Sequence, residues 1–218
     1  MVVHNILERY KGIIEESGLK SKDSIEEIDE LQHDIRDHIN KLDTQLHDNK
    51  RNFMLAIRLV ECFRILEWIK VCLYCGSYHA VYKELRYLID SMIQAYYIDT
   101  NLPSASLKTK FEAFKLFEKA KRFDFIGQNL INKLENIPNQ DKLREIYKEL
   151  SNYVHPSYKQ SLDFMEKASE KEPWDRMKEN IFNEELLKKC VLKSKEVIKC
   201  FLDIDKKFES YFLEYNRS

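Results

Sequence analysis

Apolar side chains recur every three or four residues along most of the chain, which is the period of an amphipathic α-helix. In residues 25–47 they form one continuous stripe, and the opposite face is acidic. The stripe consists of Ile28, Leu31, Ile35, Ile39, Leu42 and Leu46. We expect this acidic helical arm, at about 24–47, to extend a helical bundle or to provide a dimerisation surface.

Residues 51–75 are apolar on nearly every side, a pattern typical of a helix at the centre of a protein. Gly18 and Gly76 are expected to end helices, and Asn183 is a candidate N-cap. Further helices are expected at 2–17, 78–99, 105–121, 124–135, 141–154 and 183–215, with an irregular stretch at 157–182. These patterns predict an all-α fold, an antiparallel helical bundle of long helices. We expect one domain over 1–218, with the core bundle at about 50–215.

The composition supports this fold class and excludes several kinds of partner. The 218 residues include only 4 glycines and 4 prolines, so the chain has few of the turn residues that a β-sheet needs. The net charge of −1 excludes a global attraction to nucleic acid. Five cysteines without a secretory signal indicate free thiols and a cytoplasmic location. No run reaches the roughly 18 apolar residues of a membrane span, so no membrane association is expected.

One polar flank is predicted on the helix at 78–99. Arg86 and Asp90 are spaced for an ion pair one turn apart, beside a core face made by the apolar residues of the same helix. They could form a simple salt bridge. Alternatively, Asp90 could orient the planar guanidinium of Arg86 in a polar pocket that binds a phosphate or a carboxylate.

A second flank is predicted at the end of the helix at 141–154, where Arg144, Lys148 and His155 share one side. Histidine titrates near neutral pH and is the usual acid–base residue, and the nearby positive charges would attract a phosphodiester. Alternatively, these basic side chains have no catalytic role and lie there because the negative end of the helix dipole favours positive charge at a helix C-terminus.

A basic face is predicted over residues 105–122, where Phe111 lies beside four basic residues. These residues are Lys108, Lys115, Lys119 and Arg122. Basic groups interleaved with aromatic rings are typical of single-stranded nucleic-acid binding, although an ordinary amphipathic helix has the same pattern.

Candidate metal ligands are sparse. Cys72, Cys75 and His79 could supply three zinc ligands, but two of them lie in an apolar helix and are better explained as buried thiols. Glu30 and His33 lie opposite the apolar stripe and are expected to face solvent. His38, at the edge of that stripe, is expected to be a packing or interface residue. No cofactor is predicted, because the chain has no phosphate-binding glycine loop, nucleophile elbow or zinc-protease motif.

Two short motifs carry a resemblance to a known superfamily. The first contains Gly76, Tyr78, Leu85, Arg86, Leu88 and Asp90. The second contains Tyr147, Leu150, Ser151, His155 and Pro156. Together they resemble a group of helical proteins related to the HEPN superfamily, over about residues 50–156.

The resemblance implies a helical bundle that is often dimeric, and RNA binding or metal-independent RNA cleavage in a defence or toxin–antitoxin type system. HEPN nucleases carry an arginine shortly before a histidine on one helix. Here Lys148 is the nearest basic residue before His155, and Arg86 would have to supply the guanidinium from another helix. In that role His155 would be the acid–base group, Arg86 would stabilise negative charge and Asp90 would orient it.

Two functional hypotheses follow. In the first, the protein binds RNA, and cleaves it, at Arg86, Asp90 and His155. In the second, it is a non-catalytic helical module, expected to be a homodimer, that binds a partner protein through the acidic arm at 25–47 or the basic face at 108–122. Arg86, Asp90 and His155 would then form a buried structural network. An open pocket around Arg86 and His155 favours the first hypothesis, and a closed network in which every donor is paired favours the second.

Overall fold

The computed structural model describes residues 2–40, 52–119, 127–134, 137–154 and 183–215. These residues form α-helices and contain no strand, so the predicted all-α class is confirmed. The helices are α1 (Val2–Lys20), α2 (Lys22–Asn40), α4 (Met54–Tyr74), α5 (Tyr78–Asn101), α6 (Leu107–Lys119), α7 (Gly127–Lys133), α8 (Gln140–Val154) and α11 (Glu184–Tyr215). The last part of the expected helix at 25–47, residues 41–47, and its connection to the next helix lie outside the described residues.

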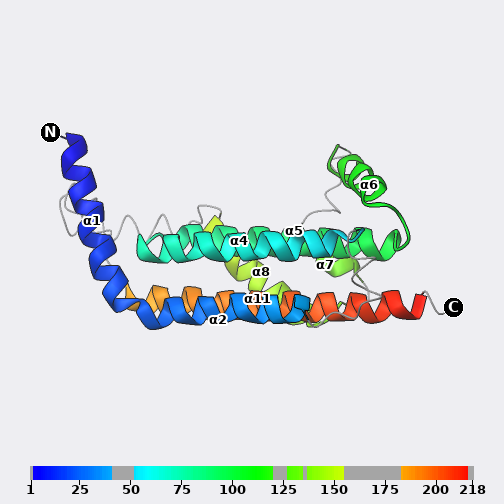
Figure 1. The fold of residues 1–218 in the computed structure, drawn as a ribbon. Coiled ribbons are helices and arrows are strands. Elements are labelled where there is room, and N and C mark those ends of the chain that lie inside the picture. Colours follow the sequence, from blue (N-terminus) through cyan, green and yellow to red (C-terminus); the bar gives the residue numbers. More distant parts are fainter. Residues whose placement is uncertain (1, 41–51, 120–126, 135–136, 155–182, 216–218) are drawn as a thin grey trace.

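The long helices α2, α4, α5 and α11 lie alongside one another, with α8 across them and α6 projecting from the end of α5 (Figure 1). Consecutive long helices run in opposite directions. Lys70 on α4 bonds Asp29 on α2 at 2.7 Å, and Tyr87 on α5 bonds Glu61 on α4 at 2.7 Å. The terminal helix instead runs parallel to both α2 and α5, so the bundle contains parallel neighbours as well as antiparallel ones.

The core forms where the apolar faces of these helices meet. The predicted core face of α5 is buried, and α5 packs against α4, α8 and α11. The described part of the α2 stripe also faces the core, because Ile28, Leu31 and Ile35 are buried and Ile39 packs against the same cluster. The part of the acidic arm that belongs to α2 therefore uses its apolar side within its own chain, against α4 and α11.

Two sequence-based expectations differ from the structure. Gly18 does not end its helix, because α1 continues to Lys20, and a Cβ at Gly18 would make only an ordinary van der Waals contact with the ring of Tyr74. The helix α4 is also not enclosed on all sides. Ile57 and Trp68 on one of its faces are exposed, whereas Leu59 and Leu66 on the other are buried.

Helix ends are stabilised in two different ways. Asn183 caps α11 as predicted, since its side-chain oxygen accepts a hydrogen bond from the Leu186 amide at 2.9 Å. The first turn of α4 has no local cap. Its amides at Met54 and Leu55 donate instead to the carboxylate of Asp99, which belongs to α5, at 3.1 and 2.9 Å.

The carboxylate of Asp99 also forms an ion pair with Lys110 of α6, at 2.9 Å, and both side chains are fully buried. The Lys110 ammonium lies 4.9 Å from the centroid of the Phe53 ring. One carboxylate thus links α4, α5 and α6. None of the described helices is long and apolar enough to cross a membrane.

Candidate functional site

The predicted pair of Arg86 and Asp90 lies where α5 meets α7 and α8. Arg86 Nε lies 3.9 Å from Asp90 Oδ2, one turn further along α5, as the spacing predicts. Arg86 also donates a hydrogen bond to the hydroxyl of Tyr147 on α8 at 3.1 Å, and its guanidinium lies 5.1 Å from the centroid of the same ring. The guanidinium is therefore engaged by an acid, a hydroxyl and an aromatic face.

This cluster is only slightly open to solvent. The side chains of Arg86 and Asp90 are 17% and 24% exposed, and Tyr147 is buried. The first residue of α7, Gly127, lies directly against the Tyr147 hydroxyl. The cluster thus joins three helices, and its side chains are largely buried.

The electrostatics of Asp90 reflect this environment. Burial raises the pKa of the Asp90 carboxyl, and Arg86, the Tyr147 hydroxyl and the Gly127 amide act in the opposite direction. Its Oδ1 atom is buried and has no hydrogen-bond partner among the described residues. Burial also raises the pKa of Tyr147, so this hydroxyl keeps its proton at neutral pH.

The third predicted catalytic residue, His155, lies outside the described residues. Tyr147, by contrast, was named only as a motif position, and in the structure its hydroxyl accepts a hydrogen bond from Arg86. Helical periodicity relates only residues within a few turns of one helix. It could not reveal this contact, because the two residues are 61 positions apart.

The predicted basic residues divide between two places. Lys108, Lys115 and Lys119 are exposed on α6, which projects from the bundle (Figure 1). Arg144 and Lys148 belong to α8. The side chain of Arg144 bonds Asp141 and Asn132, at 2.7 Å each, and Lys148 is exposed. Arg122 lies outside the described residues.

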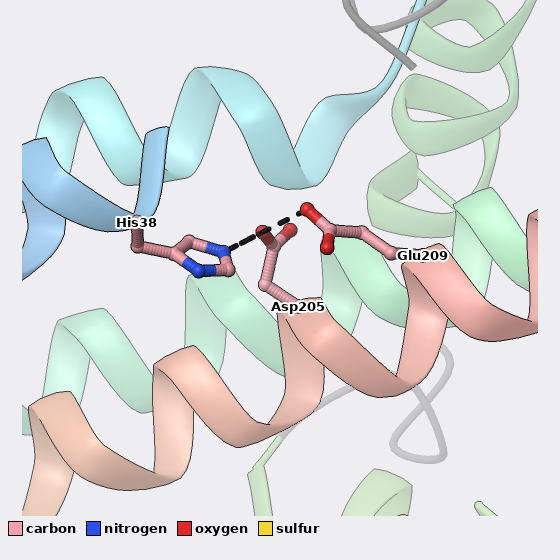
Figure 2. Close-up of side chains that lie close together, drawn as sticks. All are labelled: His38, Asp205 and Glu209. Atoms are coloured by element: carbon pink, nitrogen blue, oxygen red, sulfur yellow. Dashed lines mark hydrogen bonds and ion pairs between the residues drawn. The ribbon is translucent and has the colours of Figure 1, made fainter. Parts of the chain in front are cut away.

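A further polar cluster, which the sequence did not suggest, joins α2 to α11 (Figure 2). His38 Nε2 lies 2.7 Å from Asp205 Oδ2 and 3.7 Å from Glu209 Oε1, and the two acids are one turn apart on α11. His38 was expected to pack, and its two acidic partners were missed. The only sequence signal is the i,i+4 spacing of the acids, which is common on helices.

These three side chains are the one group of potential metal ligands among the described residues. In a tetrahedral zinc site the ligand atoms lie about 3.3 Å apart, as follows from Zn–N and Zn–O bonds of about 2.0–2.1 Å. The 2.7 Å contact between His38 and Asp205 is shorter than that and fits a direct hydrogen bond. The cluster is thus best described as a polar link between two helices.

Of the other candidate ligands, Cys75 differs from the expectation of a buried thiol, because it follows the end of α4 and is only partly buried. Cys72 is buried and burial raises the pKa of its thiol to about 11, which disfavours the thiolate that zinc requires. Glu30 and His33 are exposed on α2, and His79 is exposed on α5.

Comparison with protein-family models, with curated proteins and with solved structures finds no match to this chain. The resemblance to the HEPN superfamily therefore stays a prediction.

Proposed function

We propose that the protein is a non-catalytic helical module that binds a partner protein. The observation that supports this proposal best is the engagement of Arg86. Its guanidinium bonds Tyr147, lies over the Tyr147 ring and approaches Asp90. A guanidinium that stabilises a transition state must instead direct its donors at the reacting atoms.

The physical role of the cluster follows from where its members come from. Arg86 and Asp90 project from α5, and Tyr147 projects from α8 and touches the start of α7. A half-buried arginine is stabilised when its donors are paired, and removing it leaves a hydroxyl and a carboxylate without their partner. The cluster therefore fits a scaffold that fixes the packing of α5, α7 and α8.

The proposal is tested by incubating the purified protein with labelled single-stranded RNA in the absence of metal ions. The variant Arg86→Ala is compared with Arg144→Ala, which removes an arginine of α8 that is bonded only to Asp141 and Asn132 in the described part of the chain. We expect no cleavage by the wild type or by either variant. Cleavage by the wild type that is lost in a folded Arg86→Ala variant would overturn the proposal.

A second candidate function, binding of single-stranded RNA without cleavage, is favoured by the face of α6. Lys108, Lys115 and Lys119 are exposed there, and Phe111 between them is 46% exposed. Cations beside an exposed ring can contact the backbone and a base of a single strand. Glu112 on the same face reduces the net positive charge.

This second candidate has its own test. Fluorescence anisotropy with labelled RNA is measured for the wild type and for a variant in which Lys108, Lys115 and Lys119 are replaced by glutamine. Binding through α6 predicts an affinity that falls with salt in the wild type and a smaller salt dependence in the variant. Equal affinities for both proteins would exclude α6 as the binding face.

A further inference from the structure

The polar link between α2 and α11 has the atoms that bind a divalent metal ion. His38 offers an imidazole nitrogen, and Asp205 and Glu209 each offer a carboxylate oxygen. Every pair of these three atoms lies within 4.8 Å. Two acids one turn apart on a helix would not suggest a site by themselves. Here, however, a histidine from another helix points toward both of them (Figure 2).

The distances in the cluster lie on both sides of the spacing that an ion requires. Ligand atoms of a tetrahedral zinc ion are about 3.3 Å apart. His38 Nε2 is 2.7 Å from Asp205 Oδ2, which is about 0.6 Å too close, and 3.7 Å from Glu209 Oε1, which is about 0.4 Å too far. Small rotations about the side-chain bonds of the two acids are enough to correct both distances.

The hydrogen bond between His38 and Asp205 is compatible with such an ion. It involves Nε2, the same imidazole atom that lies near Glu209. A neutral imidazole carries its proton on one of its two nitrogens, so Nε2 is able to bind an ion when the proton is on Nδ1. The ion then takes the place of the proton between the imidazole and the carboxylate.

The surroundings of the three side chains favour ion binding. The side chains of His38, Asp205 and Glu209 are only 10%, 3% and 17% exposed. An ion is attracted more strongly to its ligands where water is largely excluded. The acids also lie beside Ile204 and Phe208, which are buried in the core and fix this part of α11. The cluster thus differs from a chance meeting of surface groups.

The two helices that carry the ligands are held in register by another contact. Lys195 on α11 forms an ion pair with Glu27 on α2. This pair precedes the contact of His38 and Asp205 by 11 residues on α2 and by 10 residues on α11. The helices therefore present the ligands from positions that are already fixed, and such preorganisation is what a metal site needs.

The types of ligand select the class of ion. Imidazole suits zinc and neighbouring transition metals, whereas magnesium and calcium are bound mainly by oxygen atoms. Carboxylate oxygens also bind zinc, at about 2.0–2.2 Å. Three protein ligands leave one tetrahedral position for a water molecule.

We propose that His38, Asp205 and Glu209 bind a divalent transition-metal ion, for which zinc is the test ion. The ion is held by Nε2 of the histidine and one oxygen of each acid, and it fastens α2 to α11. This inference goes beyond the proposed function and does not depend on it.

The first test is isothermal titration calorimetry of the metal-free full-length protein with zinc. We expect one zinc ion per chain, and an affinity that falls by at least about tenfold in His38→Gln, because even residues that only support metal ligands contribute that much. The matched control is His33→Gln, which removes an exposed histidine of the same helix. It should bind zinc like the wild type. A wild type that binds no zinc, or equal affinities of the wild type and His38→Gln, overturns the inference.

The second test needs no variant, because it measures the absorption spectrum of the wild type with cobalt(II) in place of zinc. Nitrogen and oxygen ligands give visible bands of the metal, whereas a cysteine thiolate adds an intense charge-transfer band in the near ultraviolet. We expect the visible bands alone. A thiolate band would place the ion at a cysteine, such as the partly buried Cys75, and would overturn the inference.

The third test asks whether the ion fastens the two helices. An ion that binds only the folded protein raises its unfolding temperature. We expect zinc to raise this temperature for the wild type and for His33→Gln, and to leave it unchanged for His38→Gln. An equal rise in all three proteins would show that zinc binds elsewhere and would contradict the proposed site.

Discussion

Gly127, at the start of α7, lies so close to Tyr147 on α8 that a Cβ added to Gly127 would be 1.9 Å from the tyrosine hydroxyl oxygen. Gly127 also has a φ of +51°, in the left-handed region where side chains are strained. Two independent constraints thus require glycine at this position. The same hydroxyl accepts the hydrogen bond of Arg86, so the contact is part of the cluster that joins α5, α7 and α8.

The first prediction concerns this contact. We expect Gly127→Ala to lower the free energy of unfolding by about 1–3 kcal/mol, because the new methyl group overlaps the Tyr147 hydroxyl and the backbone must move. Urea denaturation measures the change. Gly12→Ala is the matched control, since a Cβ at Gly12 has no atom within 4 Å. Because glycine is unfavourable inside a helix, Gly12→Ala should raise the free energy of unfolding by about 0.5–1 kcal/mol. Equal effects of the two substitutions would contradict the account.

The second prediction concerns the buried ion pair of Asp99 and Lys110. Lys110→Met keeps much of the side-chain volume but leaves the Asp99 carboxylate buried without its cation. We expect it to lower the free energy of unfolding by about 3–5 kcal/mol. The control is Lys108→Met, two positions earlier on α6, where the side chain is exposed. That change should stay within about 0.5 kcal/mol of the wild type.

The same pair offers a sharper comparison. In the double variant Asp99→Asn, Lys110→Met, no buried charge is left, and the asparagine oxygen can still accept from an α4 amide. We therefore expect the double variant to have a higher free energy of unfolding than the single variant Lys110→Met. A double variant that is less stable than the single one would show that the carboxylate acts on α4 without help from Lys110.

The third prediction concerns pH. Burial raises the pKa of Asp90 in the folded protein above the ordinary value of 3.8, so the folded chain binds this proton more tightly than the unfolded chain. The contribution of Asp90 to stability is therefore largest at low pH. It is lost as the pH rises from 3.8 through the folded pKa.

Asp90→Asn removes this titration. The free energy of unfolding is measured for both proteins from about pH 4 to about pH 7. The value for the wild type, relative to that for the variant, should fall as the pH rises. A difference that shifts in favour of the wild type over this range would mean that Arg86 outweighs burial at Asp90.

Much of the fold was predictable because helical periodicity is a local property. The core face of α5, the Asn183 cap and the Arg86–Asp90 spacing each involve residues within a few turns of one helix. The same periodicity placed Ile28 and Ile35 on the buried side of α2.

The contacts that the sequence did not reveal join residues that are distant along the chain. Tyr147 reaches Arg86 from another helix, and Asp205 reaches His38 across 167 positions. Neither partner has a local pattern that distinguishes it from an ordinary helical residue. The exposed face of α4 was also missed, because an apolar residue looks the same in sequence whether it is buried or exposed to solvent.

The account depends most on the claim that the Arg86 cluster is structural. A double-mutant cycle with Arg86→Ala and Tyr147→Phe, followed by urea denaturation, measures this directly. We predict that each single variant is destabilised and that the two are coupled by about 0.5–3 kcal/mol. If both single variants unfold like the wild type and show no coupling, the cluster does not hold the helices together, and Arg86 is free for a functional role.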